Sequence, residues 1–163
     1  MQSHFWRCGI TNTNAIFSIG DVPRSARILG FAGIAPQALF ALAALSPTWR
    51  FTALSAGFFY AALIVSFVGG VWWGMATAQP KAPQWVYPVA VVPSLIALAT
   101  GVPWMIGALW PWPSLAVLGT ALIASAVIDC KFWAMGLIKG DSLRLRIILS
   151  VGLGALTWLL AFL

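Results

Sequence analysis

The stretch YAALIVSFVGGVWWG, residues 60–74, decides the fold, because it carries no charged side chain and lies within a long apolar run over 53–78. A helix needs about 20 predominantly apolar residues to cross the roughly 30 Å hydrocarbon core of a bilayer. The run meets this length without interruption. It therefore predicts a transmembrane helix.

Four further apolar runs accompany this one, of which the third span is short and broken by Pro88 and Pro93. The expected fold is an all-α integral membrane bundle of five transmembrane helices. It forms a single domain over 23–163, after an N-terminal cytoplasmic arm over 1–22. The five spans are predicted at 26–46, 53–78, 86–102, 114–128 and 145–163.

The connectors are short, and two of them carry specific expectations. Residues 104–110 either extend the third helix or belong to the connector that follows it. The connector over 131–144 contains Gly140-Asp141-Ser142, which predicts a turn leading into a helix N-cap. Either choice for residues 104–110 leaves the number of spans odd.

The composition excludes a soluble protein. Of 163 residues, 61% are hydrophobic and 7% are charged, whereas a soluble domain carries about 25% charged residues. A formal net charge of +6 would favour a nucleic-acid partner in a soluble protein. Here the positive charges lie in short segments between apolar runs, so we expect no nucleic-acid partner and assign the charges to membrane orientation and contact with anionic lipid.

The positive charges also predict the topology. With five spans, all but one of the cations fall on the side of the N-terminus, and Arg50 alone falls on the other side. By the positive-inside rule, the N-terminus is cytoplasmic and the C-terminus is on the far side. The cations on the N-terminal side are Arg7, Arg24, Arg27, Lys81, Lys131, Lys139, Arg144 and Arg146.

The tryptophans fit the same topology as two interfacial belts, in which amphipathic rings lie at head-group level. The outer belt is predicted to contain Trp49, Trp104, Trp110, Trp112 and Trp158, and the inner belt Trp72, Trp73, Trp85 and Trp133.

Small residues at a spacing of four line one face of the second span. This small-residue stripe consists of Ala62, Ser66, Gly70, Gly74 and Ala78, with Gly69 beside it. Such a face lets another helix approach closely. The first interpretation is contact with a neighbouring helix of the same chain. The alternative is a homodimer interface, or a groove for a lipid or flat ligand flanked by Tyr60 and Trp73.

A basic cluster is expected at the cytoplasmic edge, with Asp129 among the cations. Asp129 ends the fourth span, and a short connector brings the start of the fifth span close to it. We predict that Asp129 pairs with one arginine and that the others hold an anionic lipid head group. Topology determination alone is the competing interpretation. The arginines concerned are Arg24, Arg27, Arg144 and Arg146.

The sequence offers little for catalysis. Its only histidine is His4, it contains no Glu, and its three acids share no paired or metal-binding spacing. We therefore predict no enzymatic activity, no cofactor and no metal site. Gln37, Pro93 and Ser94 are the candidates for a polar cavity, because a proline in a span frees backbone carbonyls.

Two segments resemble a known family. Residues 22–36, VPRSARILGFAGIAP, and residues 60–74 are similar to the transmembrane protein 69 family, and Pro93-Ser94, Asp129 and residues 143–146 fit its pattern. Departures occur at Gln37, where the family tends to have an aromatic, and at Asp141-Ser142. The resemblance implies a small multi-span protein of bacterial inner membranes or of mitochondria, without an assigned activity.

Residues 83–88, PQWVYP, superficially resemble a loop of the tryptophan-rich sensory proteins. In that family the loop follows the first span, whereas here it follows the second. Tetrapyrrole or sterol binding is therefore a minor option only.

The function expected from the sequence is a non-enzymatic module of the bacterial cytoplasmic membrane, with the mitochondrial inner membrane as the alternative location. It would bind lipid or a partner membrane protein. The alternative function is a facilitator or channel for a small solute, and an enzyme with a lipid substrate is the third option. None of the spans has an ionisable residue at its middle, which disfavours a proton-driven pump.

Overall fold

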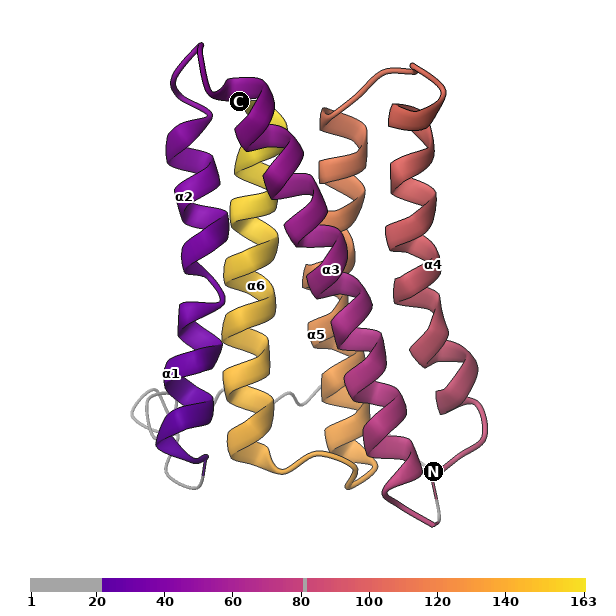
Figure 1. Ribbon diagram of the computed structural model, residues 1–163. Helices are drawn as coiled ribbons and strands as arrows, with labels where there is room; N and C mark the ends of the chain where they lie inside the picture. Colours follow the sequence, from indigo (N-terminus) through magenta and orange to yellow (C-terminus); the bar gives the residue numbers. More distant parts are fainter. Residues whose placement is uncertain (1–21, 81) are drawn as a thin grey trace.

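A computed structural model describes residues 22–80 and 82–163, and these residues fold into helices that run up and down one bundle (Figure 1). Helices α1 and α2 together form the first of five segments that are long and apolar enough to cross a membrane. The all-α, five-span fold is therefore confirmed. The helices are α1 (Arg24–Ala32), α2 (Ala35–Ala43), α3 (Arg50–Thr77), α4 (Val86–Met105), α5 (Trp112–Ala134) and α6 (Gly140–Phe162).

The first span is two short helices, whereas the sequence predicted one. Helix α1 ends at Ala32 and α2 begins at Ala35, with Pro36 in its first turn. Proline has no backbone N–H and suits the start of a helix, so it favours a new beginning here. The hydroxyl of Tyr60 on α3 donates a hydrogen bond to the carbonyl of Gly33, which gives the carbonyl at the break a partner.

The fourth helix is continuous, so the predicted break at Pro88 and Pro93 was wrong. Pro88 lies in the first turn of α4, where no intrahelical N–H is required. Pro93 is buried inside the helix and packs beneath Gly69 of α3. Tertiary packing therefore keeps α4 helical past the proline. Helix α4 extends to Met105, and Gly107 with a φ of +68° follows its end.

The connector between α5 and α6 is shorter than predicted. It spans only 135–139, and Gly136 at a φ of +74° provides the left-handed position that reverses the chain. The predicted turn at Gly140-Asp141-Ser142 was wrong, because these residues form the first turn of α6. The N-cap of α6 is Lys139, which makes no capping hydrogen bond through its side chain.

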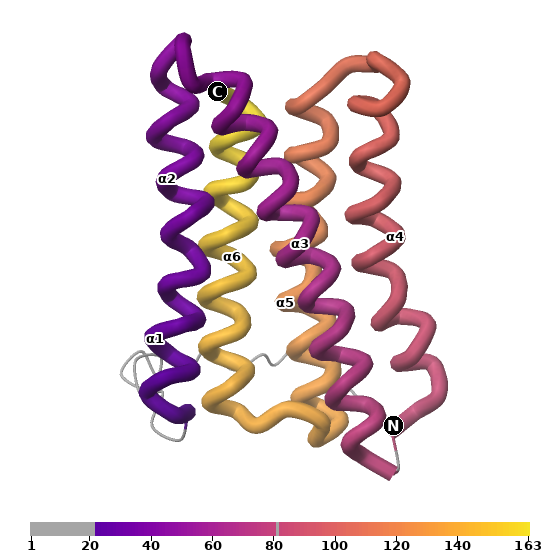
Figure 2. The backbone as a smooth tube through the Cα atoms, viewed as in Figure 1, coloured from indigo at the N-terminus to yellow at the C-terminus, as the bar shows by residue number. Residues whose placement is uncertain are grey.

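Helix α3 crosses the bundle obliquely, as the tube in Figure 2 shows, and packs against α2, α4, α5 and α6. Helices α5 and α6 pack at short range through Gly119 and Gly154. A Cβ on Gly154 would lie 2.9 Å from the carbonyl oxygen of Gly119. Small residues at this crossing thus allow backbone contact within the bundle.

The cations of the described residues lie mostly at one end of the bundle. The start of α1, the end of α5 and the start of α6 lie together at the lower end in Figure 1, which we call the basic end, and Arg50 starts α3 at the other. The described cations are thus divided between the two ends of the bundle in the way that the predicted topology requires. The predicted arm, with Arg7 and His4 in it, falls almost wholly outside the described residues, and Lys81 also lies outside them.

Candidate functional site

A buried ion pair lies toward the basic end of the bundle. Asp129 on α5 is completely buried, and it accepts hydrogen bonds from Arg146 on α6. Arg146 Nε lies 2.9 Å from one carboxylate oxygen and Nη2 lies 2.8 Å from the other. This two-bond geometry is the strong form of an arginine–carboxylate contact. Among the arginines of the predicted cluster, Arg146 is therefore the one that forms an ion pair with Asp129.

Trp72 on α3 completes the pair from a third helix. Its indole Nε1 donates a hydrogen bond of 2.7 Å to Asp129 Oδ1, and its ring meets Phe132 edge to face with centroids 5.7 Å apart. Trp72 is 2% exposed. The prediction that it belongs to an interfacial belt was wrong, because a buried indole N–H needs an acceptor and Asp129 supplies one.

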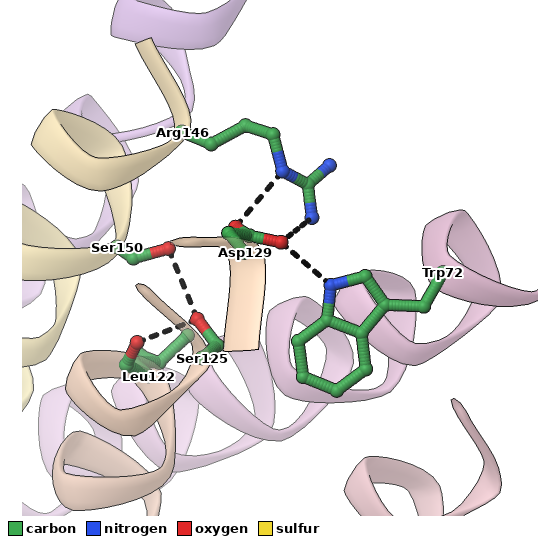
Figure 3. A network of polar contacts seen from close by, with 6 residues as sticks. All are labelled: Trp72, Leu122, Ser125, Asp129, Arg146 and Ser150. Atoms are coloured by element: carbon green, nitrogen blue, oxygen red, sulfur yellow. Dashed lines mark hydrogen bonds and ion pairs between the residues drawn. The ribbon is translucent and has the colours of Figure 1, made fainter. Parts of the chain in front are cut away.

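Hydroxyl groups extend this polar network along α5 and α6. The Ser125 hydroxyl lies 2.6 Å from the Leu122 carbonyl and 3.1 Å from the hydroxyl of Ser150. Figure 3 shows these groups beside the ion pair, with Asp129 facing Arg146 and Trp72 at once. The network ties α3, α5 and α6 together.

The carboxylate of Asp129 accepts hydrogen bonds at both of its oxygens. Trp72 and Arg146 donate to Oδ1, and Arg146 also donates to Oδ2. A charged pair inside a membrane span is costly, and such pairs usually mark functional positions. This makes the Trp72–Asp129–Arg146 network the candidate site of the protein.

The other predicted arginines lie around this pair without joining it. Arg144 Nη1 is 3.8 Å from Asp141, one turn away on α6, and both side chains are partly exposed. Exposed pairs of this kind contribute little to stability. Arg24 is exposed on α1, and Arg27 is half-buried.

Gly70 and Gly74 of the small-residue stripe face outward on α3, so the predicted contact within the chain was wrong for these two residues. A Cβ on either of these glycines would meet no atom within 4 Å. The face of α3 that packs inside the bundle is shifted by one residue, because α4 and α5 lie on that side. This packed face contains Ala61, Val65, Gly69, Trp72 and Ala76.

The remaining residues of the stripe have mixed positions. A Cβ on Gly69 would clash with the carbonyl oxygen of Ala90, so Gly69 is the close-contact glycine. The hydroxyls of Ser66 and Ser94 are 2.9 Å apart, which joins α3 to α4. Ala62 is half-buried and Ala78 is exposed. Trp73, also exposed, packs edge to face on Tyr87 with centroids 5.1 Å apart.

The predicted polar cavity does not form from Gln37, Pro93 and Ser94. Gln37 is fully buried on α2, and its Nε2 donates to Thr157 on α6 at 3.0 Å. Ser94 instead bonds to Ser66 at the surface of α4. Helices α2 and α4 do not pack against each other among the described residues, because α3 lies between them.

The structure does contain an apolar cavity, of about 270 Å³, between α3, α4 and α5. Pro93 is part of its wall. Two network residues, Trp72 and Ser125, also line it, so the cavity and the ion-pair network share a boundary. The other lining residues are Val65, Val68, Val89, Val92, Ile96, Ala121, Leu122, Ala124 and Ile128.

Sequence reasoning missed Trp72 as a member of the site and missed the apolar cavity. The available signal for Trp72 was its register with Gly69 and Val65, which lie three and seven residues earlier, respectively, on one helix face. No sequence signal located the cavity, because it depends on how α3, α4 and α5 are arranged in space.

Comparison with known proteins gives a family and no activity. Residues 22–162 match the model of DUF3429, described as a protein of unknown function, and the chain therefore belongs to that family. No curated protein matches the chain. No solved structure matches it either.

Proposed function

We propose that this member of the DUF3429 family is a non-enzymatic lipid-binding module, and that the cavity between α3, α4 and α5 receives a hydrocarbon chain. The observation that carries this proposal is the chemistry of the cavity wall. Its lining side chains are apolar except for the indole of Trp72 and the hydroxyl of Ser125. A pocket with so few polar groups suits a hydrocarbon chain better than a polar solute.

Shape complementarity would drive this binding. A hydrocarbon chain that enters the cavity leaves a bilayer interior that is as apolar as the cavity wall. The transfer therefore brings little hydrophobic gain, and close packing supplies the affinity. The cavity wall must then be held in place. The ion-pair network does this for Trp72, since its indole N–H is held by Asp129, a residue that does not line the cavity.

This proposal includes two expectations from the sequence, namely the relationship to the transmembrane protein 69 family and the location in a bacterial cytoplasmic membrane. The similarity of residues 60–74 to the transmembrane protein 69 family supports a membrane role without naming an activity. The excess of cations at the basic end supports a cytoplasmic location of that end in a bacterial cytoplasmic membrane. Binding of a partner protein through the exposed face around Gly70 and Gly74 is the competing function, and the experiment below separates the two.

Native mass spectrometry tests the proposal on protein released gently from its own membranes. We expect a lipid retained at fixed stoichiometry. The variant Ala124→Trp places a large ring in the cavity wall and should reduce that lipid at least tenfold. Ala155→Trp is the matched control, because Ala155 is an exposed alanine on α6 that does not line the cavity.

Other outcomes point elsewhere. Equal lipid retention in both tryptophan variants would contradict binding in the cavity. A retained protein subunit without lipid would favour the partner-binding function. A bare protein that conducts a small solute in liposomes would favour the facilitator.

A further inference from the structure

The guanidinium of Arg146 is only partly used by Asp129. Its Nε and Nη2 face the carboxylate, whereas the third nitrogen, Nη1, points away from it (Figure 3). The Arg146 side chain is 20% exposed, although that of Asp129 is completely buried. The pair therefore holds the guanidinium in a fixed orientation, with Nη1 turned away from the carboxylate and part of the side chain exposed.

Two helices near Arg146, α1 and α3, stand apart from each other among the described residues. Helix α1 packs on α2 and α6 but makes no close backbone approach to α3. Toward the basic end, α1 and α3 diverge, with α6 visible between them in Figure 1.

Helix α1 supplies a second cation on the same side. A Cβ on Gly30 would lie 3.0 Å from Leu149 Cδ1, so this face of α1 packs on α6. Arg27 lies one turn before Gly30 on that face, nearer the basic end. Arg27 and Arg146 thus occupy neighbouring helices at the same end of the bundle.

The basic end of the bundle carries more cations than acids. Its described residues include six cations and two acids, a surplus of four positive charges. Asp129 is neutralised by Arg146. A surplus of this sign at a membrane surface attracts anionic head groups. The residues counted are Arg24, Arg27, Lys131, Lys139, Arg144 and Arg146 against Asp129 and Asp141.

The surroundings indicate a ligand that comes from the bilayer. Ile28 and Leu29 of α1 are 68% and 71% exposed, and no residue of α1 is buried. An apolar surface next to a cationic one matches a lipid, in which a hydrocarbon chain adjoins a phosphate. A free phosphate would use only the cationic part.

We propose that Arg146, oriented by Asp129, binds the phosphate of an anionic glycerophospholipid through its outward Nη1 edge, with Arg27 as the second cation. This site goes beyond the proposed function, because Arg146 does not line the apolar cavity and the chemistry is that of a head group. Arg146 binds the phosphate, whereas Asp129 and Trp72 are positioning residues that fix the fork.

Titration of the delipidated protein with defined lipids tests this site. Native mass spectrometry compares phosphatidylglycerol, which is anionic, with phosphatidylcholine, which has a phosphate but no net charge. We expect about a tenfold preference for phosphatidylglycerol, the size of one charge-assisted hydrogen bond. The double variant Asp129→Asn/Arg146→Gln should lose this preference, and Arg50→Gln, at the far end, should keep it.

The double variant removes both charges together, so it leaves no buried charge without a partner. The single variant Arg146→Lys gives a second measurement, because it keeps the charge but not the fork. A several-fold loss of preference is expected there, because lysine has no second nitrogen edge to present to the phosphate. If a folded double variant kept the full preference, the site would be overturned.

Two further measurements distinguish a lipid from free phosphate, and the head-group site from the cavity. Competition by inorganic phosphate at equal concentration would assign the site to a free anion and overturn the lipid. If wild type binds both lipids equally and Ala124→Trp abolishes both, the cavity proposal stands and the head-group site fails. If Ala124→Trp changes nothing while the double variant loses the preference, the head-group site stands and the cavity proposal fails.

Discussion

Trp72 and Asp129 are joined by a hydrogen bond of 2.7 Å across 57 positions of sequence. The bond runs from α3 to α5, and Arg146 of α6 closes on the same carboxylate at 2.8 Å. Every side chain in this contact depends on another for its hydrogen bonds. Removing the carboxylate should therefore affect three helices at once.

Asp129→Ala is expected to destabilise the protein by about 3 kcal/mol, because Arg146 and the indole of Trp72 are left without their acceptor. Asp129→Asn should cost less, since an amide oxygen still accepts from Trp72. Thermal unfolding in detergent measures both. An Asp129→Ala protein as stable as wild type would show that the pair contributes nothing to folding.

Gly69 and Gly70 should respond oppositely to substitution. Gly69→Ala places a Cβ against the carbonyl of Ala90 and should separate α3 from α4, with a loss of about 1–3 kcal/mol from overpacking. Gly70→Ala meets open space and should leave stability unchanged or slightly raised. Unfolding temperatures of the two variants measure this difference. A lower unfolding temperature for Gly70→Ala than for Gly69→Ala would contradict the assignment of Gly69 to the packed face of α3.

Gln37 carries a buried side-chain oxygen, Oε1, that has no hydrogen-bond partner among the described residues. Gln37→Leu removes this acceptor and should be neutral or stabilising, because Thr157 keeps its bond to the Leu153 carbonyl at 2.7 Å. Thr157→Val removes the acceptor that Gln37 Nε2 has among the described residues and should destabilise by about 1–3 kcal/mol. Equal losses in both variants would contradict this account.

Tyr60→Phe removes the donor to the Gly33 carbonyl at the junction of α1 and α2. We expect faster hydrogen–deuterium exchange in residues 30–38 and a loss of about 1 kcal/mol. Tyr87→Phe is the control, because Tyr87 lies on α4, away from this junction. Unchanged exchange in the Tyr60 variant would mean that the junction is held by packing alone.

Topology can be tested by labelling single cysteines with a membrane-impermeant maleimide in a variant lacking Cys8 and Cys130. Lys139→Cys should be labelled from the cytoplasmic side and Arg50→Cys from the opposite side, as the positive-inside rule requires. Labelling of both from one side would refute the five-span arrangement.

The sequence by itself determined the class of fold and the ends of the bundle. Apolar runs of bilayer length have one solution in a membrane, since a helix alone satisfies its own backbone within one segment. The number of spans and the placement of Arg50 opposite the other described cations follow from length and charge. The choice of Asp129 as an arginine partner also came from sequence, because a short connector limits how far α6 can lie from it.

Only the tertiary structure decided which faces meet. Both Gly69 and Gly70 are small and adjacent, and a helix advances its side chains by about 100° per residue, so a shift of one position exchanges a packed glycine for an exposed one. Composition cannot fix that rotation. The arrangement of α4 and α5 around α3 does, and it also encloses the cavity, buries Trp72 against Asp129 and keeps α4 helical through Pro93.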